Sequence, residues 1–237
     1  MPTSSWKQIS LVVDIVTRLN PRRVLEVGPG AGKYGVLCRE YLGPEAVIHG
    51  IEAFPSYVGK LHDAVYDSIF VGDARELLPQ QGPDYDLVLM IDVFEHFSRE
   101  DGALVLAQCA RLAPNTLIAV PATWHPQGAY AGNEFEIHRA HYTRRDLRGL
   151  GLKQVWRIGD QLVALRSPQT LPLGRQLRSW AISTVAPSFL YDSFVSVRNS
   201  LRAGSARLPP PPRSEPRPAA TMTGALEHVG NRPRSET

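Results

Sequence analysis

The chain has 237 residues, of which 43% are hydrophobic and 21% charged, with a formal net charge of +3. This length fits one well-filled α/β domain with additional segments and excludes two large domains. The charge is mild and the sequence lacks the dense Lys/Arg clusters of a phosphate-binding surface, so it carries no strong signal for a nucleic-acid partner. Cys38 and Cys109 lie in apolar stretches typical of buried free thiols, and no secretory or membrane-spanning pattern occurs, so we expect a cytoplasmic protein.

The first predicted element is a helix over residues 6–19, where apolar side chains recur at three- and four-residue spacing. Ser4 or Ser5 is expected to cap it. Helical patterns then alternate with short runs rich in Val, Ile and Leu at 23–27, 46–51, 68–71, 87–91 and 117–120. Continuous hydrophobicity of this kind predicts strands that are buried on both faces of a parallel sheet.

Two further strands are predicted at 153–158 and 161–166, joined by Gly159-Asp160, a pair suited to a tight hairpin turn. The sheet is therefore expected to end in an antiparallel hairpin, whereas a symmetric dinucleotide-binding sheet would continue with a crossover helix and a parallel strand. The predicted fold class is α/β and Rossmann-like, with a mostly parallel seven-stranded sheet and helices on both faces.

The C-terminal third differs in composition. Residues 173–202 set apolar side chains among arginines, and Pro187 is expected to divide them into two helices. They are expected to form a lid, a homodimer surface or a peripheral membrane-surface element, in that order of preference. The Pro-rich remainder predicts a disordered tail. We therefore place the domain boundaries at 1–168, 169–203 and 204–237.

A glycine-rich turn follows the first predicted strand, with the sequence Glu-Val-Gly-Pro-Gly-Ala-Gly at 26–32. A Walker A loop would need a glycine where Val27 stands and Ser or Thr where Tyr34 stands. A dinucleotide fingerprint would need its third glycine at Lys33. The sequence fails the first pattern and fits the second poorly.

The spacing Glu-x-Gly-x-Gly-x-Gly resembles the first motif of class I S-adenosylmethionine-dependent methyltransferases, and the resemblance extends over about 21–166. It implies that the carboxylate of Glu52, at the end of the second strand, accepts hydrogen bonds from the ribose hydroxyls. It also implies that Asp73, in Gly-Asp-Ala, accepts a hydrogen bond from the adenine amino group. It also implies that Asp92, Glu95 and His96 lie near the sulfonium. The residues implied to bind S-adenosyl-L-methionine are Glu26, Gly28, Gly30, Gly32, Glu52, Ala53, Asp73, Ala74, Asp92 and Val93.

The acceptor side is expected around the segment 133–143, because some bacterial methyltransferases carry a similar Glu-x-His stretch at the mouth of the site. His138 is the first candidate for a general base or acceptor-binding residue, with Glu136 orienting its imidazole. The alternative is that both residues only brace the loop. Two roles are considered for His96: catalysis on the acceptor side, or a hydrogen bond that fixes the loop after the fourth strand.

Two smaller expectations concern the same stretch. His138 and His141 could together hold a metal ion, but no acidic cluster of the Asp-Asp-Asn type lies nearby in the sequence, so we expect none. Thr143 is expected to cap the following helix together with Asp146.

The predicted function is O-methylation of a small-molecule, lipid or glycan acceptor by in-line transfer. No Asn/Asp-Pro-Pro-Tyr/Phe motif follows the fourth strand, which disfavours the enzymes that methylate amino groups of nucleic acids. The paired-glutamate loop of protein arginine methyltransferases is also missing, which disfavours that class. Two alternatives stay open: a non-catalytic protein that binds the cofactor, and a NAD(P)-dependent oxidoreductase that uses Gly28-x-Gly30 and Glu52.

Overall fold

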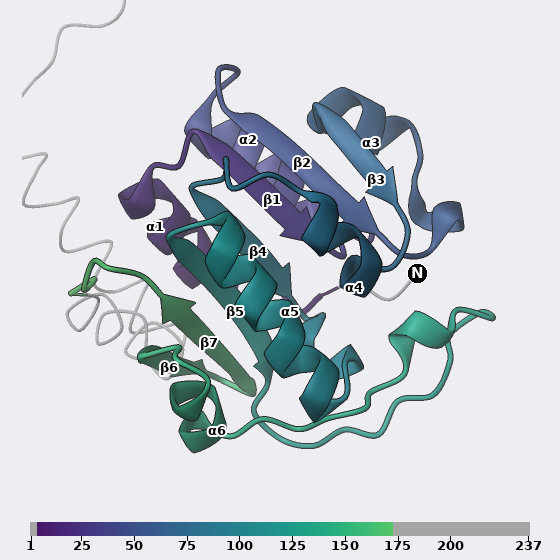
Figure 1. The fold of residues 1–237 in the computed structure, drawn as a ribbon, viewed down its shortest axis with the longest axis vertical. Coiled ribbons are helices and arrows are strands. Elements are labelled where there is room, and N and C mark those ends of the chain that lie inside the picture. Colours follow the sequence, from purple (N-terminus) through teal and green to yellow (C-terminus); the bar gives the residue numbers. More distant parts are fainter. Residues whose placement is uncertain (1–3, 173–237) are drawn as a thin grey trace, which may run out of the picture. The chain divides into compact units, whose positions relative to one another are not determined.

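A seven-stranded sheet forms the centre of the computed structural model, which describes residues 4–172 (Figure 1). The strand order is β3-β2-β1-β4-β5-β7-β6. The strands are β1 Arg23–Val27, β2 Val47–Glu52, β3 Ser68–Val71, β4 Leu87–Ile91, β5 Asn115–Pro121, β6 Gln154–Ile158 and β7 Gln161–Arg166.

The first five strands run parallel, and β7 is antiparallel to both β5 and β6. The α/β fold with a mostly parallel sheet and a terminal antiparallel hairpin is therefore confirmed. The chain order reverses between β1 and β4, which are neighbours in the sheet. At such a switch point the loops after the two strands diverge, and open α/β sheets bind their ligands there.

Burial follows the position of each strand in the sheet. All five residues of β4 are buried, as continuous hydrophobicity predicted. The prediction of burial on both faces is wrong for β3, whose residues are exposed or half-buried. This strand forms one edge of the sheet and pairs only with β2, so less of it is covered.

Helices cover both faces of the sheet. In Figure 1, α4 and α5 lie in front of the strands, while α1 and α2 lie behind them. The helices are α1 Ile9–Leu19, α2 Lys33–Leu42, α3 Lys60–Val65, α4 Ala74–Leu77, α5 Arg99–Leu112 and α6 Arg144–Gly149, and short 3-10 turns are η1 Pro55–Tyr57, η2 Leu78–Gln80, η3 Phe94–His96 and η4 Glu134–Glu136.

The first helix begins later than predicted. It starts at Ile9, and its N-cap residue is Gln8, which makes no side-chain capping bond. The predicted caps Ser4 and Ser5 are wrong because the segment before the helix binds elsewhere. The backbone N–H of Ser5 and the side-chain amide of Gln8 both donate to Asp92, at 2.9 Å each.

The C-terminal part of the sheet forms as the turn and cap signals predicted. Gly159 takes φ +56° in the hairpin between β6 and β7. Thr143 accepts from the N–H of Asp146 at 3.2 Å, and the Asp146 carboxylate accepts from the N–H of Thr143 at 2.8 Å, which is a capping box. Cys38 and Cys109 are buried free thiols.

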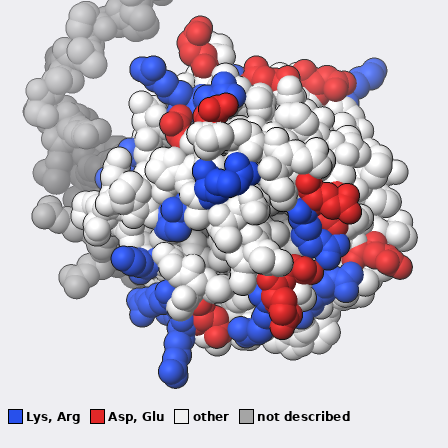
Figure 2. Space-filling model, in the orientation of Figure 1, with Lys and Arg blue, Asp and Glu red and all other residues white. Residues whose placement is uncertain are grey.

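The predicted helices at 173–202 and the predicted tail from 204 lie outside the described residues. Among the helices within 4–172, none combines the length and the hydropathy needed to cross a lipid bilayer. On the face that Figure 2 shows, acidic and basic side chains are interspersed and form no continuous basic tract.

Helix α2 packs tightly against Tyr66, the C-cap residue of α3, at Gly35, and this contact gives a test of the fold. A Cβ on Gly35 would overlap the ring of Tyr66, which is itself held by a hydrogen bond to Glu26. Gly149, in α6, is exposed and has no atom within 4 Å of the place of its Cβ. We expect Gly35→Ala to destabilise the protein by about 1–3 kcal/mol through overpacking.

The matched control, Gly149→Ala, should stabilise the protein by about 0.5–1 kcal/mol, since alanine loses less backbone entropy in a helix. Urea unfolding measures both free energies. Equal effects of the two substitutions would contradict the packing at Gly35.

Candidate active site

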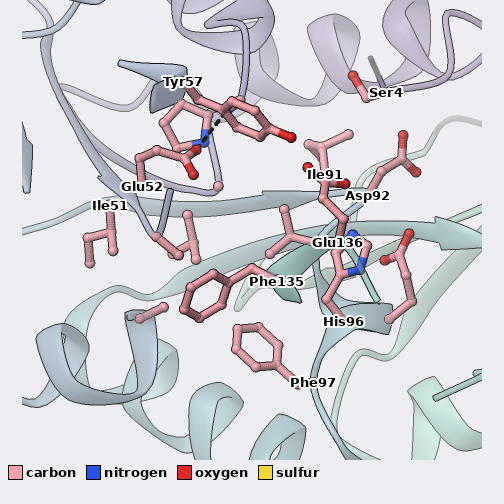
Figure 3. A pocket seen from close by; sticks show the side chains of 18 of the residues that line it. Ser4, Ile51, Glu52, Tyr57, Ile91, Asp92, His96, Phe97, Phe135 and Glu136 are labelled. Atoms are coloured by element: carbon pink, nitrogen blue, oxygen red, sulfur yellow. Dashed lines mark hydrogen bonds between the residues drawn. The ribbon is translucent and has the colours of Figure 1, made fainter. Parts of the chain in front are cut away.

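A cleft of about 470 Å³ lies at the carboxyl ends of the parallel strands (Figure 3). Glu52 and Tyr57 lie on one side of it, and Asp92, His96 and Glu136 lie on the other. With one exception, every predicted site residue lines this cleft: Glu26, Gly28, Gly30, Glu52, Ala53, Asp73, Ala74, Asp92, Val93, His96, Glu136 and His138.

The exception is Gly32, the third glycine of the loop after β1. It takes φ +82° at the N-cap of α2, and a Cβ there would face the side chains of His62, Leu61 and Tyr66. The glycine is therefore needed for the turn into the helix. It does not line the cleft, so its predicted contact with the cofactor finds no support.

The first two glycines have different reasons to lack a side chain. Gly28 takes φ +69°, and a Cβ on it would lie 2.5 Å from Cγ2 of Val93 in the loop after β4. Gly30 takes φ +54° and lines the cleft, and no protein atom lies within 4 Å of the place of its Cβ. Gly28 thus allows two loops to meet, and Gly30 leaves backbone open to a ligand.

Glu52 is held rigidly at the end of β2. Its two carboxylate oxygens accept from the backbone N–H of Gly30 at 3.0 Å and from that of Phe54 at 2.9 Å. Burial raises the pKa of Glu52, and these backbone donors oppose the rise. The carboxylate is therefore fixed to the glycine loop and presents its remaining lone pairs to the cleft.

Glu26, the last charged residue of β1, is also buried. It accepts a hydrogen bond of 2.7 Å from the hydroxyl of Tyr66. Burial raises the pKa of Glu26 to about 7, although the Tyr66 bond opposes this, and the nearby charge of Glu52 adds to it. The group is therefore poised to ionise when a cation binds beside it.

Asp73 follows β3, as predicted, but Arg75 binds its carboxylate. The backbone N–H of Arg75 donates to it at 2.8 Å, and the guanidinium donates to both oxygens. Partial burial alone would raise the pKa of Asp73, but the hydrogen bonds and charge of Arg75 outweigh it and leave the pKa lowered. The residue is an ion-paired helix cap that also lines the cleft.

Asp92 follows β4 in a left-handed conformation, with φ +54°. Such a φ is uncommon outside glycine and marks a strained loop. Burial raises the pKa of Asp92 to about 6, opposed by the donors Ser5 and Gln8. Because Lys33 also donates to the carbonyl of Ser4, the segment before α1 is fastened over this end of the cleft.

Two histidines and a glutamate meet on the acceptor side. The rings of His96 and His138 lie 5.0 Å apart between centroids, and Glu95 is buried beside them. Burial lowers the pKa of His96 to about 4 and raises that of Glu95 well above its usual range, to which the charge of Asp92 contributes. The Nδ1 of His96 donates to the carbonyl of Ile137 at 3.2 Å, a bond that joins the loop after β4 to residue 137. The catalytic role considered for His96 stays a prediction.

The predicted pairing of Glu136 with His138 is wrong. The Nδ1 of His138 bonds to the carbonyl oxygen of His125 at 2.6 Å. Glu136 instead contacts Gln127, through its own carbonyl at 2.8 Å and its carboxylate at 3.5 Å. The backbone of the loop, rather than a carboxylate, orients the His138 ring.

Several lining residues were not predicted from the sequence. Those from the chain before α1, and Gln127, had no motif to identify them, since the cleft only forms when distant segments meet. Asn133 and Phe135 lie in the segment 133–143, where the acceptor side was expected, but were not named as site residues. Phe97 was adjacent to the predicted Glu-His pair and could have been included. The additional lining residues include Ser4, Ser5, Tyr57, Phe97, Gln127, Asn133, Phe135 and Gln161.

Comparison with known families gives one match along the chain. Residues 24–115 match the family model described as a methyltransferase domain. This range spans β1 to the start of β5 and contains the glycine loop, Glu52, Asp73 and Asp92. No curated protein matches the sequence.

Solved structures share the fold at low sequence identity. The N-terminal domain of EvdMO1, determined in the presence of SAH and D-fucose, is 12% identical with a TM-score of 0.52, covering 70% of this chain and 85% of that one. A Burkholderia thailandensis 1,6-didemethyltoxoflavin-N1-methyltransferase is 18% identical with a TM-score of 0.53, covering 68% and 77%. The protein PH0226 from Pyrococcus horikoshii OT3 is 15% identical with a TM-score of 0.51, covering 69% and 88%.

Fold and family match define an α/β enzyme of the methyltransferase class. The protein is an S-adenosylmethionine-dependent methyltransferase, and S-adenosyl-L-methionine is its cofactor. The described residues fit this cofactor in charge and shape: the open backbone at Gly30 and the buried carboxylates of Glu26 and Glu52 line one cleft at the switch point.

The raised pKa of Glu26 gives a pH-dependent prediction. In the folded protein without cofactor Glu26 ionises near pH 7, above its unfolded value, so between about pH 4.5 and 7 the folded state binds the extra proton. Stability should therefore fall as pH rises through this window. Glu26→Gln removes this loss. The melting temperature of the variant minus that of the parent protein should therefore be larger at pH 8 than at pH 5.

The contribution is at most on the order of 3 kcal/mol. Thermal unfolding without cofactor at the two pH values measures it, and Glu45→Gln, at an exposed position, is the control. A melting-temperature difference that does not change with pH would contradict the buried, protonated state of Glu26.

Proposed function

We propose that the protein methylates a hydroxyl oxygen of a small-molecule, lipid or glycan acceptor. The observation that carries this proposal is the pair His96 and His138, whose rings lie 5.0 Å apart and which lines the same cleft as the glycine loop. His96 lies on the side of Asp92 (Figure 3). Imidazole nitrogens at this place can accept the proton of a hydroxyl group or bind the hydroxyl directly.

The cofactor half of the cleft is formed by the strand ends. We assign the ribose hydroxyls to Glu52, because its carboxylate is fixed by two backbone donors and retains lone pairs for two more. We assign the methionine part to the loop of Gly28 and Gly30 and to Glu26, whose carboxylate is suited to an ammonium group. Asp73 and Ala74 are assigned to the adenine side, with Arg75 holding Asp73 in place.

The acceptor half is formed by the loop after β4 and the segment 127–139. When bound, the cofactor would supply an electrophilic methyl group: a C–O bond forms, the C–S bond breaks with its pair returning to sulfur, and the hydroxyl proton passes to an imidazole nitrogen of His138. The chain has to align the acceptor and exclude water from it. Phe97 and Phe135 line the cleft and provide apolar surface for an acceptor.

A small acceptor also suits the size of the cleft, which at about 470 Å³ must hold both molecules. Two structures of similar fold were determined with a small molecule as well as S-adenosylhomocysteine. One was determined in the presence of D-fucose, and the other, a 1,6-didemethyltoxoflavin-N1-methyltransferase, with bound 1,6-didemethyltoxoflavin. The choice of oxygen as the acceptor atom rests on the histidine pair of this chain.

The cofactor assignment predicts the effect of Glu52→Ala. We expect this change to weaken the binding of S-adenosylhomocysteine at least about tenfold, since it removes charge-assisted hydrogen bonds and the brace of Gly30. Isothermal titration calorimetry measures the affinity. Glu76→Ala is the control, at an exposed position outside the cleft, and an unchanged affinity in both variants would overturn the assignment.

The acceptor assignment predicts the effect of His138→Gln. This variant should bind S-adenosylhomocysteine with the parent's affinity but transfer methyl about 10²–10⁴-fold more slowly, the range typical of acid–base catalysis. Transfer is measured with methyl-labelled cofactor and a panel of phenols, sugars and hydroxylated lipids. Alkali-stable label in ether products supports the proposal, and label found only in N-methyl or S-methyl products contradicts it.

A further inference from the structure

We propose that Glu95, His96 and His138 bind a divalent transition-metal cation, such as Mn²⁺, Co²⁺ or Zn²⁺, on the acceptor side of the cleft. One ligand atom from each of these side chains lies within 4.8 Å of the other two. Bonds of about 2.0–2.2 Å in a tetrahedral site space the ligand atoms by about 3.4 Å, so the three need to close by at most about 1.4 Å. Two imidazoles and one carboxylate are a ligand set that such cations prefer.

A second, independent observation concerns Glu95. Its side chain is only 3% exposed, and its Oε2 is buried with no hydrogen-bond partner. A buried carboxylate oxygen without a partner costs free energy, and an ion that belongs at the site is one of its ordinary explanations. A divalent cation between Glu95 and the two histidines would supply the missing partner.

The two imidazoles are already held as metal ligands usually are. A carbonyl oxygen can only accept, so the Nδ1 of His96 donates to Ile137 and the Nδ1 of His138 donates to His125. These bonds fix the proton on Nδ1 and leave the Nε2 lone pair as the ligand. Histidines that bind metals commonly donate their other ring N–H to a carbonyl or carboxylate in this way.

The backbone holds the three residues together across a long sequence separation. The N–H groups of Arg139 and Ala140 both donate to the carbonyl of Glu95, at 2.8 and 3.1 Å. His138 is therefore fastened to the loop of Glu95 and His96. His141, the partner considered from the sequence, bonds through Nε2 to the carbonyl of Ala122 and does not line the main cleft.

The role of the cation toward the acceptor rests on the proposed function, whereas its binding does not. Glu95, His96 and His138 all line the cleft, so the remaining coordination positions are open to an acceptor oxygen. A bound divalent cation lowers the pKa of a coordinated hydroxyl. With the cation bound, this site replaces the histidine base of the proposed function: His96 and His138 act as ligands, and the hydroxyl proton passes to solvent. The oxygen pair then forms the C–O bond, and the C–S pair stays on sulfur.

The test is a titration of the purified full chain, freed of any polyhistidine tag, with Co²⁺ and with Mn²⁺. Calorimetry gives stoichiometry and affinity, and the visible bands of Co²⁺ show whether nitrogen ligands bind it. We expect one site per chain, and at least about tenfold weaker binding in Glu95→Gln and in His138→Gln. His125→Gln, which keeps the carbonyl that holds His138, is the matched control and should bind as the parent does.

Binding of S-adenosylhomocysteine, measured on every variant, shows that each is folded and separates the two proposals. No cation binding by the parent chain, or equal binding in all variants, overturns the metal site even where the cofactor product binds normally. If methyl transfer to oxygen fails while the cation still binds through Glu95 and His138, the proposed function is overturned and the metal site stands.

Discussion

The close approach of two loops at Gly28 and Val93 is the constraint on which the site depends. A β-carbon at residue 28 would lie 2.5 Å from Cγ2 of Val93, so only glycine allows the loop after β1 to lie against the loop after β4. Because β1 and β4 are neighbours across the reversal of strand order, their loops diverge beyond this contact. One turns into α2 and carries Gly28 and Gly30, and the other carries Asp92, Glu95 and His96.

The cleft that opens there collects buried and half-buried carboxylates, which differ in their hydrogen-bond partners. Glu52 accepts from backbone N–H groups, and Glu26 accepts from Tyr66. Asp92 accepts from the segment before α1, but Glu95 has an oxygen with no partner. Such a concentration of acid groups is costly without cations, and a positively charged cofactor on one side and a metal ion on the other would both offset it.

Much of the fold could be predicted because its signals are local. Strands β1, β3, β4 and β7 have the predicted boundaries, and the Gly159 turn and the Thr143 cap formed as expected. Predictions failed where a distant segment decided the outcome. The edge position of β3 left it exposed, and the segment with the expected caps Ser4 and Ser5 is bound to Asp92 through the backbone N–H of Ser5 and does not cap α1.

The two halves of the site differ in the same way. The proposed cofactor half comes from residues at or directly after the ends of β1, β2, β3 and β4, and parallel strands bring such residues to one edge of a sheet whatever the loops do. The acceptor half depends on a loop contact between His96 and Ile137, which are 41 positions apart, and on the carbonyl of His125. No spacing in the sequence encodes that contact, so the histidines could be named beforehand but not their partners. Loops of this kind can change while the sheet is kept, and for that reason the acceptor is the more variable property of such a site.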